Sequence, residues 1–383
     1  LIDATAFDDT AGNSYAGISS TTALNFSTKP GEVFNETVKT LTKNQTVAAI
    51  NSLNQSLNRI AGRMNYIRST NNSSSNQNIR LAMNFDNPLV TEMLNSLSAK
   101  LINKQKETEK WGVWSEGNIS FGRIGQHDGN LGQDIHSDGI TFGIDKRINE
   151  DKTIGFAVNK SWQETEVGSN EANMDAAAIS IMNYTSFKIE DKRYLEIVAG
   201  IGEMDIELSR DVTGGKNTGN RKGNQIFGSF TYLLEPDVEI VGRNLNYYTR
   251  LDLGFTQLNA YTETGDGTAV SYKKQNVKSL SLSAGLNLSK IIETDKAILE
   301  PSLKFELGKD KTINSVSEAY YINNTSEIYS NAIGDQNSGH LLLNLGIGAK
   351  FKNEVNINAS YEHYRSTDDA FNNNFSIYLR KPL

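Results

Sequence analysis

The side chains that most often carry out chemistry are scarce in this chain. It has 383 residues with four histidines and no cysteine, so disulfides, thiol nucleophiles and thiolate metal ligands are all excluded. His127 and His136 lie close to Asp128 and Asp134 in sequence. A zinc site, however, needs converging ligands that further hydrogen bonds hold in place. We interpret these residues as a solvated loop and predict no metal site and no cofactor.

Two further patterns that could indicate an enzyme lack the context they need. Gly214-Gly215-Lys216 has neither the spacing nor the strand–helix setting of a phosphate-binding loop. The chain also has no serine nucleophile elbow and no arrangement of serine, histidine and aspartate that is typical of a hydrolase. We therefore predict no catalytic residues and no enzymatic activity.

Charge and hydropathy exclude two more classes of protein. The net charge is −7, which argues against nucleic acid as a partner, because phosphate binding needs a concentrated basic surface. The mean hydropathy is −0.47, and no stretch approaches the ~20 apolar residues of a membrane-crossing helix. A transmembrane β-barrel stays possible, because its strands alternate and average out to polar.

The first 110 residues contain two helical patterns. From Phe34 to Arg68, apolar residues recur every three or four positions, which predicts an amphipathic helix. A polar linker, residues 69–78, follows it. A second pattern begins after Asn87-Pro88, a suitable cap and first-turn proline, and ends in the charged run Lys104–Lys110.

From Trp111 onward the apolar period becomes two, which predicts β-strands. In Leu299–Leu307 and His340–Phe351 one face of each strand is apolar, while the other carries glycines, amides and charges. A water-filled lumen tolerates that polar face and lipid demands the apolar one. The residues predicted to face a lumen are Glu300, Lys304, Glu306, Asn344 and Lys350.

Further features favour a barrel over a soluble β-sandwich, which also alternates and remains the alternative. Aromatic residues gather at strand ends, as in the interface girdles of membrane proteins. Short connections alternate with longer polar ones, among them Asp211–Arg221. The predicted fold is a transmembrane, about 12-stranded antiparallel β-barrel with an N-terminal α-helix in the lumen and a further helical or irregular N-terminal segment.

Several segments, in order, resemble one family over residues 111–383. Trp111–Gly122 (WGVWSEGNISFG) resembles the first strand of autotransporter translocator domains of type V secretion. Tyr261-Thr262-Glu263-Thr264-Gly265 is similar to the family's loop after the seventh strand, and Leu299-Glu300-Pro301 to its ninth strand. The resemblance implies an outer-membrane protein whose upstream chain lies at the cell surface, and it implies partners: its own passenger domain, the outer-membrane barrel assembly machinery and periplasmic chaperones.

A helix directly before the first strand can lie inside the barrel. Residues 88–108 span about 31 Å as a helix, close to the ~30 Å hydrocarbon thickness of a bilayer. We predict the pore helix within 87–110, between a passenger remnant and helical linker (1–86) and the barrel (111–383). Its polar side chains are Glu92, Asn95, Ser96, Lys100 and Asn103. The alternative is a helix that packs on a soluble domain through its apolar face.

Barrels of the family end in a strand with alternating apolar residues, which the assembly machinery recognises. Here Phe375, Ile377, Leu379 and Leu383 keep one phase, although Lys381 interrupts it and Leu383 replaces a final aromatic residue. The predicted function is an outer-membrane translocator, monomeric and in contact with lipid, that exports and anchors an N-terminal passenger. The alternatives are a porin-like diffusion channel and a surface adhesin or binding module.

Overall fold

The structure is a computed structural model that describes residues 35–69, 111–126, 130–169, 171–236, 244–265, 268–313, 315–332, 337–351 and 356–380. The chain divides into two units, Leu1–Asn35 and Glu36–Leu383.

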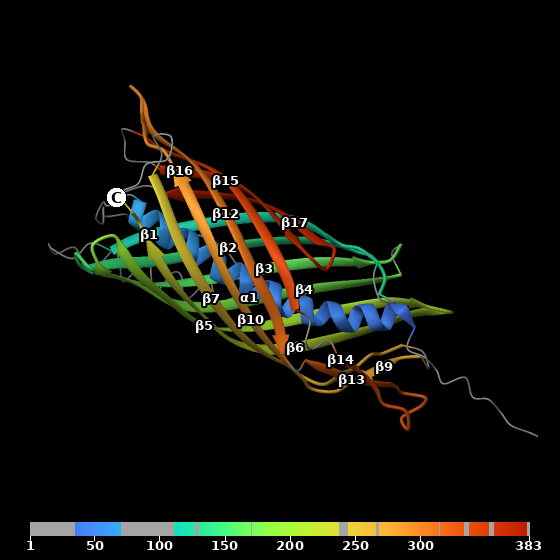
Figure 1. The fold of residues 1–383 in the computed structure, drawn as a ribbon. Coiled ribbons are helices and arrows are strands. Elements are labelled where there is room, and N and C mark those ends of the chain that lie inside the picture. The colour runs from blue at the N-terminus through green and yellow to red at the C-terminus, as the bar shows by residue number, and fades with distance from the viewer. Residues whose placement is uncertain are drawn as a thin grey trace, which may run out of the picture. The chain divides into compact units, whose positions relative to one another are not determined.

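Twelve long strands of the described residues form one closed antiparallel sheet (Figure 1). Each strand pairs with the next long one along the chain, and the first pairs with the last, which closes the barrel. The strands are β1 (Trp111–Ile124), β2 (Gln133–Asn149), β3 (Lys152–Val167), β4 (Ala172–Glu190), β5 (Arg193–Val212), β6 (Gly215–Leu234), β7 (Asn244–Leu258), β10 (Gln275–Ser289), β12 (Ala297–Ile313), β15 (Asn337–Phe351), β16 (Asn356–Ser366) and β17 (Ala370–Arg380). The predicted 12-stranded barrel is confirmed.

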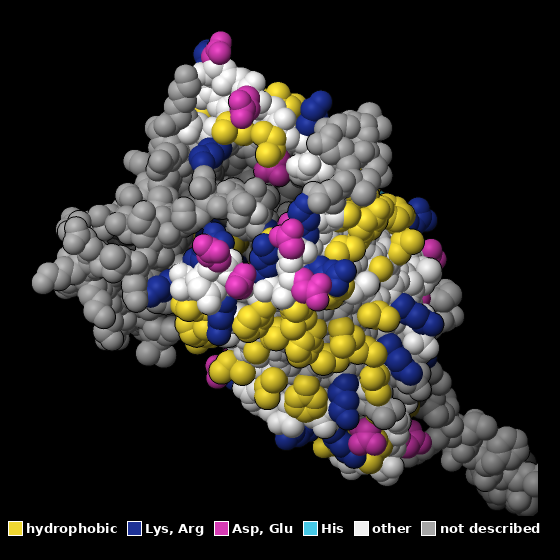
Figure 2. Space-filling model, turned by 60° about the vertical axis from the view of Figure 1, so that its left-hand side comes forward, with side chains coloured by type: hydrophobic (Ala, Val, Ile, Leu, Met, Phe, Trp, Pro, Cys, Tyr) yellow, Lys and Arg dark blue, Asp and Glu magenta, His cyan; other side chains and the backbone are white. Residues whose placement is uncertain are grey.

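The outer surface of the barrel is apolar, as the period of two predicts. Ile201, Ile226 and Ile377 are each at least 60% exposed, whereas a water-soluble monomer rarely exposes a large contiguous apolar patch. Figure 2 shows one face of the molecule, where hydrophobic side chains form a broad field with charged side chains on either side of it. This surface suits lipid rather than water.

The two ends of the barrel differ in the length of their connections. We call the end with residues 125–132, 168–171, 259–274 and 314–336 the loop end, and the end with residues 150–151 and 191–192 the turn end. One connection predicted to be a loop is mostly strand. Of Asp211–Arg221, only Thr213 and Gly214 lie between β5 and β6, and Gly214 has a φ of 99°, which suits a tight turn. Polar residues can stay paired as β-strand where the hairpin extends beyond the apolar outer surface of the barrel.

The helix α1 (Glu36–Ser69) lies along the inside of the barrel (Figure 1). Its position agrees closely with the helix predicted for Phe34–Arg68. It packs mainly against β3 to β7 and β10. Its first turn carries Glu36 and its last turn carries Arg68, which complement the positive and negative ends of the helix dipole. At about 1.5 Å per residue it spans roughly 50 Å, enough to run the length of the lumen.

A small second sheet lies at the loop end. It contains β8 (Tyr261–Thr262), β9 (Val270–Tyr272), β13 (Val316–Tyr321) and β14 (Tyr329–Ala332), in the order β14-β13-β9-β8. A bridge between Thr218 and Thr264 joins it to the extended β5–β6 hairpin. The short β11 (Ile292–Glu293) pairs with β12 at the turn end. We call the four-stranded sheet the lid.

Candidate functional site

The interior of the barrel carries many buried polar side chains beside apolar clusters, and α1 is buried on all sides over its first half. From Thr37 to Leu53 most side chains of α1 are buried, whichever way they point. They are mainly Thr, Asn, Gln, Ser and Ala, together with a few apolar residues. Small and uncharged polar side chains let a helix pass close to a wall that is itself polar. The site is therefore the lumen, and its occupant is α1.

The middle of α1 makes uncharged hydrogen bonds to the inward face of the strands. The hydroxyl groups of Ser56 and Ser180 are 2.9 Å apart. Asn51 Nδ2 donates to Gln163 Oε1 at 3.1 Å. Gln225 Nε2 donates to the backbone carbonyl of α1 residue Ala49 at 3.1 Å. These contacts involve β3, β4 and β6, the wall that α1 follows.

The loop-end part of α1 is held by connections between strands. Thr37 Oγ1 donates to Glu171 Oε2 at 2.8 Å. Thr40 Oγ1 accepts from the backbone N–H of Leu131 at 2.8 Å. Apolar residues of α1 and of the strands, led by Leu41, Ala48 and Ala49, form a buried core cluster here.

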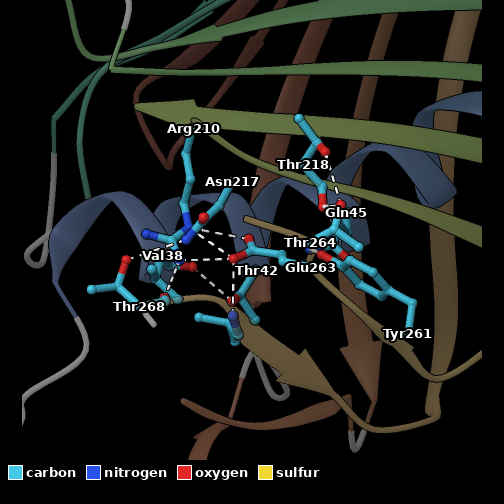
Figure 3. A network of polar contacts seen from close by, with 11 residues as sticks. Val38, Thr42, Gln45, Arg210, Asn217, Thr218, Tyr261, Glu263, Thr264 and Thr268 are labelled. Carbon is cyan, nitrogen blue, oxygen red and sulfur yellow. Dashed lines mark hydrogen bonds and ion pairs between the residues drawn. The ribbon is translucent and has the colours of Figure 1, made fainter. Parts of the chain in front are cut away.

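One buried ion pair and its neighbours hold the lid to the barrel wall (Figure 3). Arg210, on β5, donates from Nη2 to Glu263 Oε2 at 2.7 Å, and both side chains are almost completely buried. Glu263 also accepts from the backbone N–H of Val270 at 3.0 Å, and Arg210 donates to the carbonyl of Thr268. The pair thus ties the β8–β9 loop to the barrel wall.

Tyr261 links the lid to α1 itself. Gln45 Nε2 donates to the Tyr261 hydroxyl at 3.4 Å, and Arg221 Nη1 donates to Gln45 Oε1 at 2.6 Å. The rings of Tyr261 and Tyr272 stack with centroids 4.7 Å apart. Burial, followed by the nearby Tyr272 and Glu263, raises the pKa of the Tyr261 hydroxyl, so it is neutral at physiological pH.

The turn-end part of α1 is held by charges instead. Arg59 Nη1 lies 2.7 Å from Glu116 Oε1 on β1. Arg63 donates two hydrogen bonds to Asp145 on β2, at 2.7 and 2.8 Å. Arg68 lies against Glu196 on β5 and 3.5 Å from Glu235. We call Arg59, Arg63 and Arg68 the arginine ladder.

Aromatic residues enclose the middle arginine of the ladder. Tyr184 donates to Asp145 at 2.8 Å and accepts from the indole N–H of Trp114 at 2.8 Å. Arg63 also donates to the hydroxyl of Tyr378. Trp114 is fully buried, so this ion pair is shielded from water and fully hydrogen-bonded, the condition under which a buried pair is strong.

The opposite wall of the lumen carries a second charged network. Arg250 lies 3.0 Å from Asp252 and 3.5 Å from Glu306. Glu306 is 1% exposed, lies 3.2 Å from Lys304, and accepts from the hydroxyl of Tyr248. His340 lies between Glu306, at 3.4 Å, and Asp310, at 2.6 Å.

The residues predicted to face the lumen all lie in one phase of their strands. Glu300 and Lys304 share that phase with Glu306 on β12, and Asn344 shares it with Lys350 on β15. Lys304 and Asn344 line a cavity beside α1, and Asn344 Nδ2 donates to Glu362 at 3.3 Å. Glu300 and Lys350 are half-buried.

Other predicted residues fall partly outside the described chain. Glu92, Asn95, Ser96, Lys100 and Asn103, and with them the pore helix predicted for 87–110, lie outside the described residues, as does Leu383. The helix that the structure places in the lumen is α1. On β17, Phe375 and Ile377 point outward and are 51% and 63% exposed, and Leu379 lies in the same strand.

The arginine ladder is the main feature that the sequence reasoning missed. A signal for it exists: residues 37–85 contain no acidic residue, although Arg59, Arg63 and Arg68 follow one another in a single helix. Buried cations need partners, and here the partners must come from the polar faces of strands. Glu116, Asp145 and Glu196 stand on those faces.

A closed barrel with a helix in its lumen is an arrangement that can be compared with proteins of known structure. Residues 113–362 match the autotransporter beta-domain family. The chain belongs to that family. Its fold is similar to the translocator domain of the autotransporter NalP from Neisseria meningitidis, with 18% identity and a TM-score of 0.58 over 77% of this chain and 95% of that one.

A second solved structure, the beta domain of the Bordetella autotransporter BrkA, is 14% identical with a TM-score of 0.52 and covers 71% of this chain and 99% of that one. A comparison with curated proteins gives no match. This autotransporter beta-domain is an outer-membrane barrel that exports the N-terminal passenger to which it is covalently joined.

Two features are absent from the part of the chain that the structure describes. None of their helices has the length and apolar character needed to cross a membrane. Among the same residues, no group of three or more histidine, aspartate or glutamate side chains is placed to hold a metal ion.

Proposed function

We propose that α1 is the part of the exported chain that stays in the barrel once export ends, with the loop end facing the outside of the cell. The observation that carries this proposal is the direction of α1. Its first residues contact loop-end residues such as Glu171 and Leu131, and its last arginine contacts Glu196 and Glu235 near the turn end. In outer-membrane barrels the longer loops are extracellular, so the chain before Glu36 leaves on the cell surface.

In this role α1 closes the lumen and anchors the passenger. The arginine ladder fixes α1 at the turn end, and the lid with Arg210 and Glu263 covers it at the loop end. A porin-like diffusion channel would need an open lumen, which α1 fills. An adhesive role for the lid and the loop 314–336 remains a separate hypothesis.

The barrel reaches this state with the help of partners. We propose that the barrel assembly machinery recognises β17 through Phe375, Ile377 and Leu379, and that periplasmic chaperones carry the chain to it. Lipid contacts the apolar outer surface, and we expect a monomer with no nucleic-acid partner and no enzymatic activity. Glu300, Lys304, Glu306, Asn344 and Lys350 would face the lumen; Glu92, Asn95, Ser96, Lys100 and Asn103, together with the division at residues 86 and 110, stay predictions.

The absence of cysteine gives a direct test of orientation. Asn35→Cys places a single thiol at the start of α1, and Asp191→Cys places one at the turn end, where the side chain of Asp191 is 81% exposed. On intact cells a membrane-impermeant maleimide should label the Asn35→Cys variant and spare the Asp191→Cys variant. After the outer membrane is opened, both should react. Labelling of the Asp191→Cys variant alone on intact cells would show the reverse orientation.

A further inference from the structure

The charges on the outside of the barrel are divided unevenly around its loop end. The middle of the outer surface is an apolar belt of outward-pointing side chains, among them Phe121, Leu307 and Leu341, which are 49%, 54% and 39% exposed. Outward and inward side chains alternate along a strand. The outward residues between this belt and the loop end can therefore be followed from strand to strand.

One side of the barrel carries positive charges at this level. Its strands are neighbours in the order β10, β12, β15, β16, β17 and β1. Lys309 is the next outward residue of β12 after Leu307, and Arg123 is the next outward residue of β1 after Phe121. Among the described residues, the outward positions of these six strands hold no carboxylate. We call their cations the basic face: Arg123, Lys278, Lys309, Lys311 and Arg365.

The other side, formed by β2 to β5, carries mainly carboxylates at the same level. Glu164 lies opposite Asp175, and Asp175 lies opposite Glu207 on the next strand. Like charges that face each other across strands repel. An anion near the loop end is therefore repelled by this side of the barrel and attracted by the basic face.

Most cations of the basic face are available to a ligand. Lys278, Lys309 and Arg365 are exposed, and Lys311 is half-buried. Arg123 lies 3.4 Å from Asp134, whereas the other four form no ion pair within the part of the chain that the structure describes. A bound anion would therefore interact with charges that no carboxylate neutralises.

Two of these cations stand on either side of β15. Lys309 lies opposite Gly339, and Arg365 lies opposite Leu341, the next outward residue of β15. The strands that carry them are two strand spacings apart, about 10 Å, and Gly339 adds no side chain between them. Long lysine and arginine side chains can both reach one phosphate group across that distance.

The other two cations form a second pair beside the first. Lys311 is the next outward residue of β12 after Lys309, about 7 Å further along the strand. Lys278 lies opposite Ile313, so it is a diagonal neighbour of Lys311. Diagonal neighbours are within reach of long side chains. The basic face thus offers two adjacent pairs of cations directly above an apolar surface.

We propose that the basic face binds the head group of a membrane lipid that carries two phosphate groups. Lys309 and Arg365 hold one phosphate, Lys278 and Lys311 hold the other, and the acyl chains lie on the apolar belt along Leu307. Phosphate forms strong charge-assisted hydrogen bonds with lysine and arginine, and basic clusters at a membrane surface bind anionic head groups. That the lipid belongs to the outer leaflet rests on the proposed function, which places the loop end outside the cell.

Native mass spectrometry of the full chain in a non-ionic detergent, titrated with diphosphorylated lipid A, tests the binding. The wild-type protein should bind one molecule. Lys309→Gln should raise the dissociation constant about five-fold, and Lys309→Gln with Arg365→Gln about 25-fold. The matched control is Lys222→Gln, which removes an exposed, outward cation on β6 opposite Asp205. It should leave the dissociation constant unchanged.

Several results would contradict the proposal. No binding, or equal binding of lipid A from which both phosphates have been removed, would show that phosphate is not recognised. Equal losses from Lys222→Gln and Lys309→Gln would show that net charge matters and the basic face does not. Displacement by an equal concentration of inorganic phosphate would show that no lipid is recognised. The measurement in detergent does not depend on orientation, so a reversed orientation in the thiol-labelling experiment would change only the leaflet.

Discussion

The two halves of α1 are held in the lumen by different kinds of interaction. The loop-end half relies on hydrogen bonds made by its own uncharged side chains, such as Thr37 and Thr40, and on an apolar cluster. The turn-end half relies on the arginine ladder, with each arginine against a carboxylate of the wall. Both halves lie inside the barrel, yet only the second carries buried charges that need one particular partner.

The two halves therefore have different roles. One fills the lumen, and the other sets the position of α1 along it. Threonine, serine and asparagine recur along the loop-end half, so a shift along the axis replaces one such hydrogen bond by another. A shift of four residues, about 6 Å, would instead put Ile67 opposite Asp145 in place of Arg63 and leave a buried carboxylate without a cation. Such a charge is costly to bury. The ladder therefore fixes the register, and the loop-end half, whose buried side chains are uncharged, permits passage.

The largest effect should come from the middle of the ladder. Arg63→Met leaves Asp145 buried without its cation, and removing one partner of such a pair costs about 3–5 kcal/mol. Hydrogen exchange of the α1 amides in refolded protein should speed up by at least about a hundred-fold, since 1.4 kcal/mol corresponds to ten-fold. Arg63→Met combined with Asp145→Asn should recover much of the protection. Unchanged exchange in the single variant would show that the ladder does not hold α1.

The lid should respond less, although its ion pair is equally buried. Arg210→Gln leaves Glu263 without its cation, but a loop can open locally and let water reach the carboxylate. We expect a loss of at most about 3 kcal/mol, confined to the lid. Limited proteolysis within residues 259–274 should become faster, while exchange at Arg59 to Arg68 should not change. Arg210→Gln with Glu263→Gln is the control, and it should restore resistance.

The same contrast shows which parts of the molecule the sequence predicts. The strands follow from the period of two, because lipid on one side and water or α1 on the other impose it on every strand. Ile201 and Ile226, on adjacent strands, point outward, and the buried positions that alternate with them include both polar residues such as Gln225 and apolar ones such as Met204. The reach of β5 and β6 past Asp211 does not follow, because outside the membrane a polar strand and a polar loop have the same composition.

The occupant of the lumen is harder to predict. The helix predicted for residues 88–108 is the nearer one in sequence to the first strand, so it is the one predicted to lie in the lumen. Those residues lie outside the described residues. The apolar spacing of 34–68 predicts a helix. It does not predict what surrounds that helix, because the spacing of Leu53, Leu57 and Ile60 fits both a helix buried on all sides and an amphipathic helix at a surface. Pairing across more than fifty residues, as between Arg59 and Glu116, is set by the closed barrel and is not visible in local sequence.

A moderate effect is expected from an uncharged contact of α1. Ser56 lies within hydrogen-bond distance of the Ser180 hydroxyl and of Asn159 Oδ1, at 2.9 and 3.2 Å. Ser56→Ala should lower the protection of α1 by about 1 kcal/mol, the usual net value of a neutral hydrogen bond. Ser180→Ala is the matched variant, and the double variant should cost less than the sum of the two. A loss as large as that of Arg63→Met would remove the distinction between the two halves.

The smallest effect should come from an ion pair of the same chemistry at the surface. Lys188 Nζ lies 3.0 Å from Asp191 Oδ1 at the turn end, and the Asp191 side chain is 81% exposed. The hydrogen bond and the charge of Lys188 lower the pKa of Asp191. A carboxyl whose pKa is lower in the folded state stabilises above its unfolded pKa and loses that contribution as the pH falls through the folded value. Because solvent screens this exposed pair, the melting temperatures of wild type and Asp191→Asn should coincide from pH 7 down to pH 3. The opposite result would be a lower melting temperature of the variant at pH 7, with the difference from wild type disappearing in acid. It would show that exposed pairs also stabilise this protein and that burial is not what makes the arginine ladder strong.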